Sequence, residues 1–403
     1  PAPSIRRQES VDVGDKASDQ SRRGLVPGIN QDQRSALHRL AMFVPLSGPL
    51  AEKGRGLRDA AMLAIFGSAL GNVELAFYDS FADLPVGSLE YREHLHSLTR
   101  LAIDEGAAVI IGPLLGDATH PVSQIAGPRG IPVISFSNNT DLAVMAKEGQ
   151  GGTFIFGMAP EQQIASMLGF IAKGGAARIA LLAPDTEYGR LVRRALHQLG
   201  PIQVADLSII DVLYDPAIRD FSKPTDRLIA KARRIDFLLL AVNDQVALRI
   251  IAAQLDQRDI GAPSVQLIGL QPWQWLDDLG SEPALNSAWF VGIPEAHMRL
   301  FGQHFQAIFG NRPEPFSAIA YDAVMIVAAL LNREGSTVEK LSARQGFLTI
   351  NGLVRFDHTG LSERTYAIYR VHDDSYSLLD PAAGSFAGKV TDPQGYDVVD
   401  APN

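Results

Sequence analysis

The chain of 403 residues has no cysteine, no long apolar run and no basic stripe, and each absence excludes a class of protein. Without cysteine it has no disulfide, no thiolate metal site and no cysteine nucleophile, although this leaves the cellular compartment open. No apolar run approaches the roughly 18 residues that a membrane-spanning helix requires. The formal net charge is −9, with no cluster of Lys and Arg, which argues against nucleic acid as a partner.

The sequence also lacks the short motifs of common catalytic chemistry. It contains no Gly-x-Ser-x-Gly elbow, no His-Glu-x-x-His metal helix, no Walker loop and no Gly-x-Gly-x-x-Gly turn. The nine histidines are scattered along the chain. Asp185 and Glu187 resemble an acid pair, but solvated loop charges are the commoner explanation of such a pattern. We therefore expect no enzymatic activity, no cofactor and no metal.

What the chain does contain is a repeated alternation of short apolar runs and amphipathic helices. The stretch "RLAMFVPLSGP" predicts a strand and a loop, and "GRGLRDAAMLAIF" predicts the helix that follows. The pattern recurs in "AAVIIGPLLG", which precedes a helix expected around 121–127, and again in "ARIALLAPDTEYGRLVRRALHQLG". Because strands alternate with helices and the length exceeds one core, we predict two doubly wound, Rossmann-like α/β lobes with parallel sheets.

Polar loops follow the predicted strands at the edge where such sheets bind ligands. The loops are "PLSGP", "GPLLGDAT", "SFSNN", "APDTEYG" and "AVNDQ". Ligands of doubly wound sheets lie outside the carboxyl ends of the strands, so two facing lobes would form a central cleft from these loops. Trp273 and Trp275 follow a later strand, and they predict either an exposed recognition surface or, more commonly, core packing.

Two family resemblances rest on these loops. "PLSGPLAEKGRGLRDAAMLA", "VIIGPLLGDATHPVSQIAGPRGIPVIS" and "FSAIAYDAVMIVAALL" resemble the Leu/Ile/Val-binding type of bacterial periplasmic binding protein, the type I fold. Within that superfamily, "APDTEYGR" and "INGLVRFDHTGLSERTYAIYRV" look most similar to the penicillin-binding-protein activator lipoproteins. The resemblance implies hinge crossovers between the lobes. The expected division is 40–157 plus 291–342 for lobe 1 and 158–290 plus 343–385 for lobe 2, with a flexible leader at 1–39 and a tail at 386–403.

The resemblance also implies a ligand site in the cleft. In the amino-acid binders, hydroxyl and backbone N–H groups of the loop after the "VIIGP" strand bind the ligand's carboxylate. Only Thr119 keeps a hydroxyl at that loop, and an ionised Asp117 beside a carboxylate would be repulsive. Asp244 is the candidate for an ammonium-binding acid, although it also suits a helix N-cap beside Asn243. The expected ligand-binding residues are Ser47, Asp117, Ala118, Thr119, Asn138, Asn139, Tyr188 and Asp244.

Two functions of different classes remain open from the sequence. The departures at the carboxylate loop favour an activator-like platform in the periplasm that docks a peptidoglycan synthase and works in cell-wall synthesis. Such a protein would touch the membrane only through an N-terminal lipoprotein anchor that is missing from this sequence. The alternative is the solute-binding component of an ABC transporter, which would enclose an amino acid or another small polar ligand and deliver it to a permease.

Overall fold

The computed structural model describes residues 37–386, except 67–71, 148, 176, 205, 232–234, 277–278, 315, 332–339, 343–345, 374 and 385. The expected leader therefore falls almost wholly outside the described residues, and β1 already begins at His38. The expected tail lies outside them too, apart from residue 386. No helix within the described ranges combines the length and apolarity that a membrane crossing needs.

The first lobe is built on a five-stranded parallel sheet in the order β2-β1-β3-β4-β5. Its strands are β1 His38–Val44, β2 Val73–Asp79, β3 Ala107–Ile111, β4 Val133–Ser135 and β5 Thr153–Ile155. Successive side chains of β1 point to opposite faces, so that Leu40, Met42 and Val44 enter one core while Ala41 and Phe43 enter the other. A strand buried on both faces reads as a continuous apolar run, as this one does.

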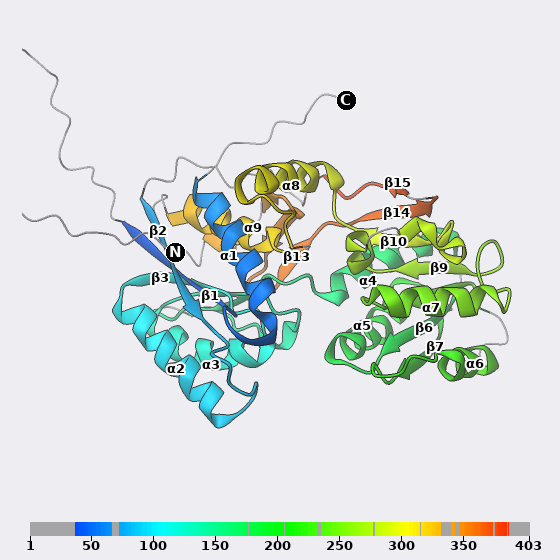
Figure 1. The fold of residues 1–403 in the computed structure, drawn as a ribbon, viewed down its shortest axis with the longest axis horizontal. Helices are drawn as coiled ribbons and strands as arrows, with labels where there is room; N and C mark the ends of the chain where they lie inside the picture. The colour runs from blue at the N-terminus through cyan, green and yellow to red at the C-terminus, as the bar shows by residue number, and fades with distance from the viewer. Residues whose placement is uncertain are drawn as a thin grey trace, which may run out of the picture. The chain divides into compact units, whose positions relative to one another are not determined.

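Helices cover both faces of the first sheet (Figure 1). α1 (Ala51–Phe66) and α9 (Ala318–Leu331) pack together on one face, and α2 (Leu89–Asp104) and α3 (Gly116–Ala126) pack on the other. α1, the helix predicted after the first strand, buries Leu57, Ala60, Ala61 and Ala64 at helical spacing. Small residues on this face let α1 lie close to α9.

The second lobe contains a seven-stranded sheet in the order β15-β14-β10-β9-β8-β6-β7. The strands β6 to β10 run parallel, whereas β14 is antiparallel to β10 and β15 is antiparallel to β14. They span β6 Arg178–Pro184, β7 Ser208–Tyr214, β8 Phe237–Leu240, β9 Gln266–Gly269, β10 Trp289–Gly292, β14 Ala367–His372 and β15 Ser375–Asp380. One core packs α4 (Pro160–Ile171) and α5 (Glu187–Gln203) on one face. Another packs α6 (Ser222–Lys231) and α7 (Gln245–Asp256) on the other. The prediction of two α/β lobes with parallel sheets is confirmed.

The chain passes between the lobes after β5, after β10 and between β13 and β14. β10 still pairs in the second sheet, and α8 (Glu295–Phe309) packs with the first core. A small antiparallel sheet of β11 Phe347–Thr349, β12 Gly352–Phe356 and β13 Ser362–Arg364 follows. Here the contacts differ from the expected division, because Phe347, Val354 and Phe356 are buried in the first core. Only the part from β14 onward joins the second sheet.

Two buried ionisable side chains, Arg364 and Asp322, lie where these crossings meet. Arg364 donates to the carbonyl oxygens of Asn351 (3.2 Å) and Phe156 (3.4 Å), and its guanidinium lies 5.0 Å from the centre of the Phe156 ring. Asp322 accepts hydrogen bonds from the backbone N–H groups of Ile350 and Asn351 and from Nδ2 of Asn351. Burial raises the pKa of the Asp322 carboxyl, although Arg364 and these donors oppose the rise. The pair ties α9 and the small sheet to the residue that follows β5.

Candidate functional site

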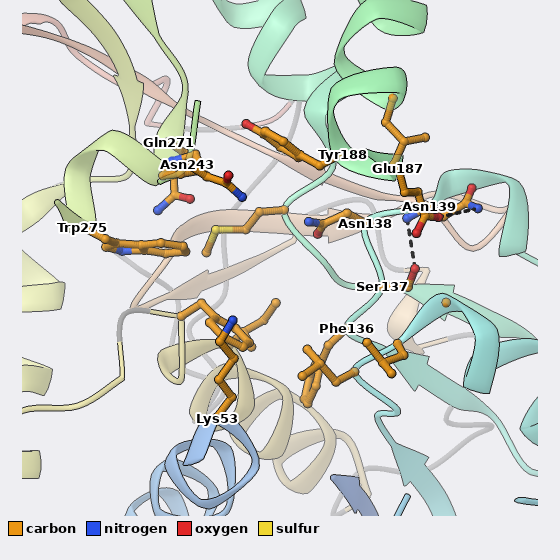
Figure 2. A pocket seen from close by; sticks show the side chains of 18 of the residues that line it. Lys53, Phe136, Ser137, Asn138, Asn139, Glu187, Tyr188, Asn243, Gln271 and Trp275 are labelled. Carbon is orange, nitrogen blue, oxygen red and sulfur yellow. Dashed lines mark hydrogen bonds between the residues drawn. The ribbon is translucent and has the colours of Figure 1, made fainter. Parts of the chain in front are cut away.

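A pocket of about 530 Å³ lies between loops of the two lobes. Its walls are the segments that follow β3, β4, β5, β8 and β9, together with the starts of α1 and α5 and the segment between α8 and α9. These are mostly the carboxyl ends of parallel strands, where ligands of such sheets bind. From the first lobe the labelled residues of Figure 2 are Lys53, Phe136, Ser137, Asn138 and Asn139; from the second they are Glu187, Tyr188, Asn243, Gln271 and Trp275.

The first-lobe wall is ordered by short-range hydrogen bonds after β4. Oγ of Ser137 accepts the N–H of Asn139 at 3.1 Å, and Oδ1 of Asn139 accepts the N–H of Asp141 at 3.0 Å. The second bond caps the short helix η3 (Thr140–Leu142). Since its oxygen is used locally, Asn139 presents its Nδ2 amide to the pocket. Gly157 lets this loop lie close by, because a β-carbon there would be 2.1 Å from the carbonyl oxygen of Ser137.

Glu187 connects the second lobe to this wall. It is the first residue of α5, which Thr186 caps by accepting the N–H of Gly189. Its Oε1 lies 3.5 Å from Nδ2 of Asn139, and a β-carbon on Gly116 would lie 3.9 Å from the same oxygen. Gly116 is the first residue of α3. A carboxylate of the second lobe therefore reaches the start of a first-lobe helix.

The second-lobe wall presents hydrogen-bond donors. The Oε1 of Gln163 accepts the N–H of Gln271, and its Nε2 donates to the carbonyl oxygen of Met158. Gln271 is 1% exposed. Its Nε2, like the indole Nε1 of Trp275, is buried and has no hydrogen-bond partner among the described residues. An unsatisfied buried donor costs roughly 1–3 kcal/mol, so these two side chains of the second-lobe wall keep unused donor capacity.

Tyr188 and Trp275 give the pocket aromatic surface. Burial raises the pKa of the Tyr188 hydroxyl, and the nearby Tyr366 adds to the rise, so the group is neutral and able both to donate and to accept. The Trp275 ring lies 6.4 Å from that of Phe316, which also lines the pocket. Trp273 instead packs in the second-lobe core and donates to the carbonyl oxygen of Val242. Trp273 thus packs in the core, whereas Trp275 lines the pocket, so neither core packing nor an exposed recognition surface describes both tryptophans.

Three of the expected ligand-binding residues line the pocket, namely Asn138, Asn139 and Tyr188. Ala118 and Thr119 do not, because they lie in the first turn of α3 and are buried. The hydroxyl of Thr119 is bonded to the carbonyl oxygen of Leu115 and to the Ser135 hydroxyl.

Ser47, Asp244 and Asp117 are also absent from the pocket lining. Ser47 bonds to the Asp79 carboxylate and to the N–H of Asp83. Asp244 caps α7 by accepting the N–H of Ala247 at 2.7 Å, and the preceding Asn243 is the residue that lines the pocket. Asp117 lines a neighbouring cavity of about 310 Å³, together with His120 and others.

The sequence analysis did not predict Lys53, Asn243, Gln271 and Trp275 as residues of one site, and it did not predict a binding role for Glu187. Asn243 and Gln271 directly follow predicted strands, and this position could have identified them as residues of the cleft. Asp185, the proposed partner of Glu187 in an acid pair, is exposed and bonded to Arg190 at 2.7 Å. No group of three or more potential metal ligands was found within the described ranges.

Comparisons with known proteins agree with this architecture. A family model for periplasmic binding proteins matches residues 38–375. An uncharacterised protein of Rickettsia prowazekii is 20% identical over 357 residues, which is 84% of this chain and 88% of that protein. An ABC transporter substrate-binding protein from Sphaerobacter thermophilus has a similar fold, with a TM-score of 0.69 at 20% identity over 87% of this chain and 98% of that one.

A structure with a bound ligand shares the fold as well. It is the isoleucine complex of a branched-chain amino acid transporter substrate-binding protein from Streptococcus pneumoniae, with a TM-score of 0.59 at 17% identity over 85% of this chain and 99% of that one. The resemblance to the Leu/Ile/Val-binding type is thus confirmed at the level of the superfamily, whereas these relatives do not support the activator subgroup. The chain belongs to the periplasmic binding protein family, whose members are extracytoplasmic ligand-binding proteins and not enzymes.

Proposed function

We propose that this protein is the solute-binding component of an ABC transporter and that it encloses one small polar solute in the pocket between its lobes. The observation that carries the proposal is a pocket lined from both lobes, mostly by the segments that follow parallel strands. A pocket of about 530 Å³ has the size of a small-molecule site. The substrate-binding relatives of similar fold add to this support.

Residues of both lobes would contact the solute, so binding would favour the conformation in which the two walls face each other. Asn139 and Lys53 would contribute from the first lobe, and Gln271, Trp275 and Tyr188 from the second. The protein would then present the enclosed solute to a membrane permease. Attachment through a lipid anchor stays a prediction from the resemblance.

The test is thermal unfolding of the purified protein against amino acids, small organic acids, amines and cell-wall muropeptide fragments. A solute that binds only the folded state, at a hundred times its dissociation constant, adds about 2.7 kcal/mol to the free energy of unfolding. We expect a saturable rise for at least one small solute and its loss in Gln271→Ala. Gln306→Ala is the matched control, because Gln306 is exposed on α8.

If no small solute raises the midpoint, the transport proposal is wrong. Binding of muropeptides alone, or retention of a peptidoglycan synthase with no small solute bound, would instead support the activator-like platform. A rise that persists in Gln271→Ala would place the solute outside this pocket.

A further inference from the structure

The charged groups of the pocket are distributed unevenly. Glu187 and Asn139 lie on one side in Figure 2, and Lys53, Gln271 and Trp275 lie on the other. The neighbouring cavity gives the same division, because Gly116, Asn139 and Glu187 line both cavities, whereas Lys53, Gln271 and Trp275 line the larger one alone. The pocket therefore has the carboxylate of Glu187 on the side at the start of α3, and Lys53 together with Glu314 on the side at α1.

Glu187 places a carboxylate at the start of α3, a position where an anionic ligand group could otherwise bind. The start of a helix carries partial positive charge, and α3 begins at Gly116. A β-carbon there would be 3.9 Å from Oε1 of Glu187, so the protein's own carboxylate already lies at this helix end. A second carboxylate brought by a ligand would meet it at short range and be repelled.

Glu187 also keeps capacity for a ligand. Its Oε1 faces Nδ2 of Asn139 at a long 3.5 Å, and its Oε2 has no hydrogen-bond partner in the described part of the chain. A carboxylate accepts several hydrogen bonds, and an ammonium or guanidinium group would supply charge-assisted ones.

The opposite side suits an acceptor. Lys53 makes no ion pair or hydrogen bond with the described residues, and Figure 2 shows its side chain rising from α1 into the pocket. Nε2 of Gln271 and Nε1 of Trp275 are unpartnered donors. Glu314 also lines the pocket, and its side-chain stem lies against Gly56 in α1. With two carboxylates and one lysine, the charged lining disfavours a dianion.

We propose that the solute carries an amino or guanidino group that binds the carboxylate of Glu187, with an acceptor group directed toward Lys53 on the side that Gln271 and Trp275 line. This inference rests on the proposed function and assigns the chemical class of its solute. It places a cationic group where the resemblance to amino-acid binders implied the ligand's carboxylate. Glu187 is then the residue that determines specificity.

The experiment is calorimetric titration with three compounds of equal chain length, 1,5-diaminopentane, 5-aminopentanoate and glutarate, and with arginine and glutamate. We expect 5-aminopentanoate and arginine, which carry a cationic group and one carboxylate, to bind most tightly, and 1,5-diaminopentane to bind more weakly because it lacks the acceptor. Glutarate and glutamate, which carry an extra carboxylate, should bind at least ten-fold more weakly than 5-aminopentanoate. Glu187→Gln should weaken amine binding about ten-fold or more, as the loss of a charge-assisted hydrogen bond implies. Asp185→Asn, which removes the same charge two residues away and outside the pocket, should leave binding unchanged.

Glu187→Lys adds a gain-of-function test, because it should raise the affinity for glutarate relative to 5-aminopentanoate. Tighter binding of glutarate than of the amines by the unmodified protein would overturn the assignment while leaving a solute-binding protein. Unchanged amine binding in Glu187→Gln would overturn it in the same way. If none of the five compounds and none of the wider panel binds, the proposed function and the assignment fail together.

Discussion

The carboxylate of Asp79 fixes the loop that leads into α1, and its replacement by Asn should cost stability in a pH-dependent way. Its Oδ1 accepts the N–H groups of Leu46 at 2.8 Å and Phe81 at 3.1 Å, and the Ser47 hydroxyl also bonds to it. Burial alone would raise the pKa of Asp79, but these donors and the N–H of Ala82 outweigh it and lower the pKa.

The magnitude follows from the loss of charge. Asn keeps one acceptor oxygen, so Asp79→Asn replaces charge-assisted hydrogen bonds by neutral ones rather than removing them. Charged bonds contribute about 1.5–3 kcal/mol and neutral ones about 1 kcal/mol. Because Asp79 is only partly buried, we expect a loss of about 1–2 kcal/mol in the free energy of unfolding at pH 7.

The pH dependence has a definite sign. Since the folded-state pKa of Asp79 lies below its usual value of about 3.9, its stabilisation is present above that value and is lost as the pH falls through the folded-state pKa. Urea denaturation should therefore show the full deficit of Asp79→Asn at pH 7 and a smaller one at pH 3. Asp104→Asn is the control, because Asp104 is exposed in the last turn of α2. An equal deficit at both pH values would refute the reasoning.

Two further predictions concern the pocket wall and the contact between the lobes. Gly157→Ala should cost about 1–3 kcal/mol or more in the free energy of unfolding, because the new methyl group would lie 2.1 Å from the carbonyl oxygen of Ser137. Gly169→Ala, in open space within α4, should stabilise by about 0.5–1 kcal/mol, and a similar effect of both changes would contradict the steric argument. Arg194→Ala should cost at most about 1 kcal/mol, because the 2.7 Å ion pair with Asp141 across the lobes is largely exposed. Denaturation in 1 M salt should abolish that difference, and a difference that persists would point to packing instead.

The lobes could be predicted because their signal is local. A strand such as β1 is apolar throughout since both its faces are buried, and α1 shows its buried face at helical spacing. The segments that cross between the lobes show no such local pattern. Phe347 and Val354 join the first core although β14 follows them into the second lobe, and nothing in their own sequence distinguishes the two destinations.

The error at the first loop has an identifiable cause. The helix was expected around 121–127, and proline is indeed common at the start of helices. The structure instead begins α3 at Gly116 and holds Pro121 inside the helix. The residues read as a ligand-binding loop are therefore the first turn of a helix, which directs Ala118 and Thr119 into the core.

A hydroxyl or carboxylate group in a cleft loop can bind a ligand only if neighbouring protein groups do not already occupy its hydrogen-bonding capacity. Ser47 and Thr119 are bonded to neighbouring protein groups, and Asp244 caps a helix, so these three short polar side chains are satisfied locally. Lys53 and Gln271 line the pocket instead, and their side-chain nitrogen atoms have no partner in the described structure. Predicting a cleft from sequence therefore requires the hydrogen bonds of each loop to be assigned first, because the groups that remain after this assignment are the ones that can recognise a solute.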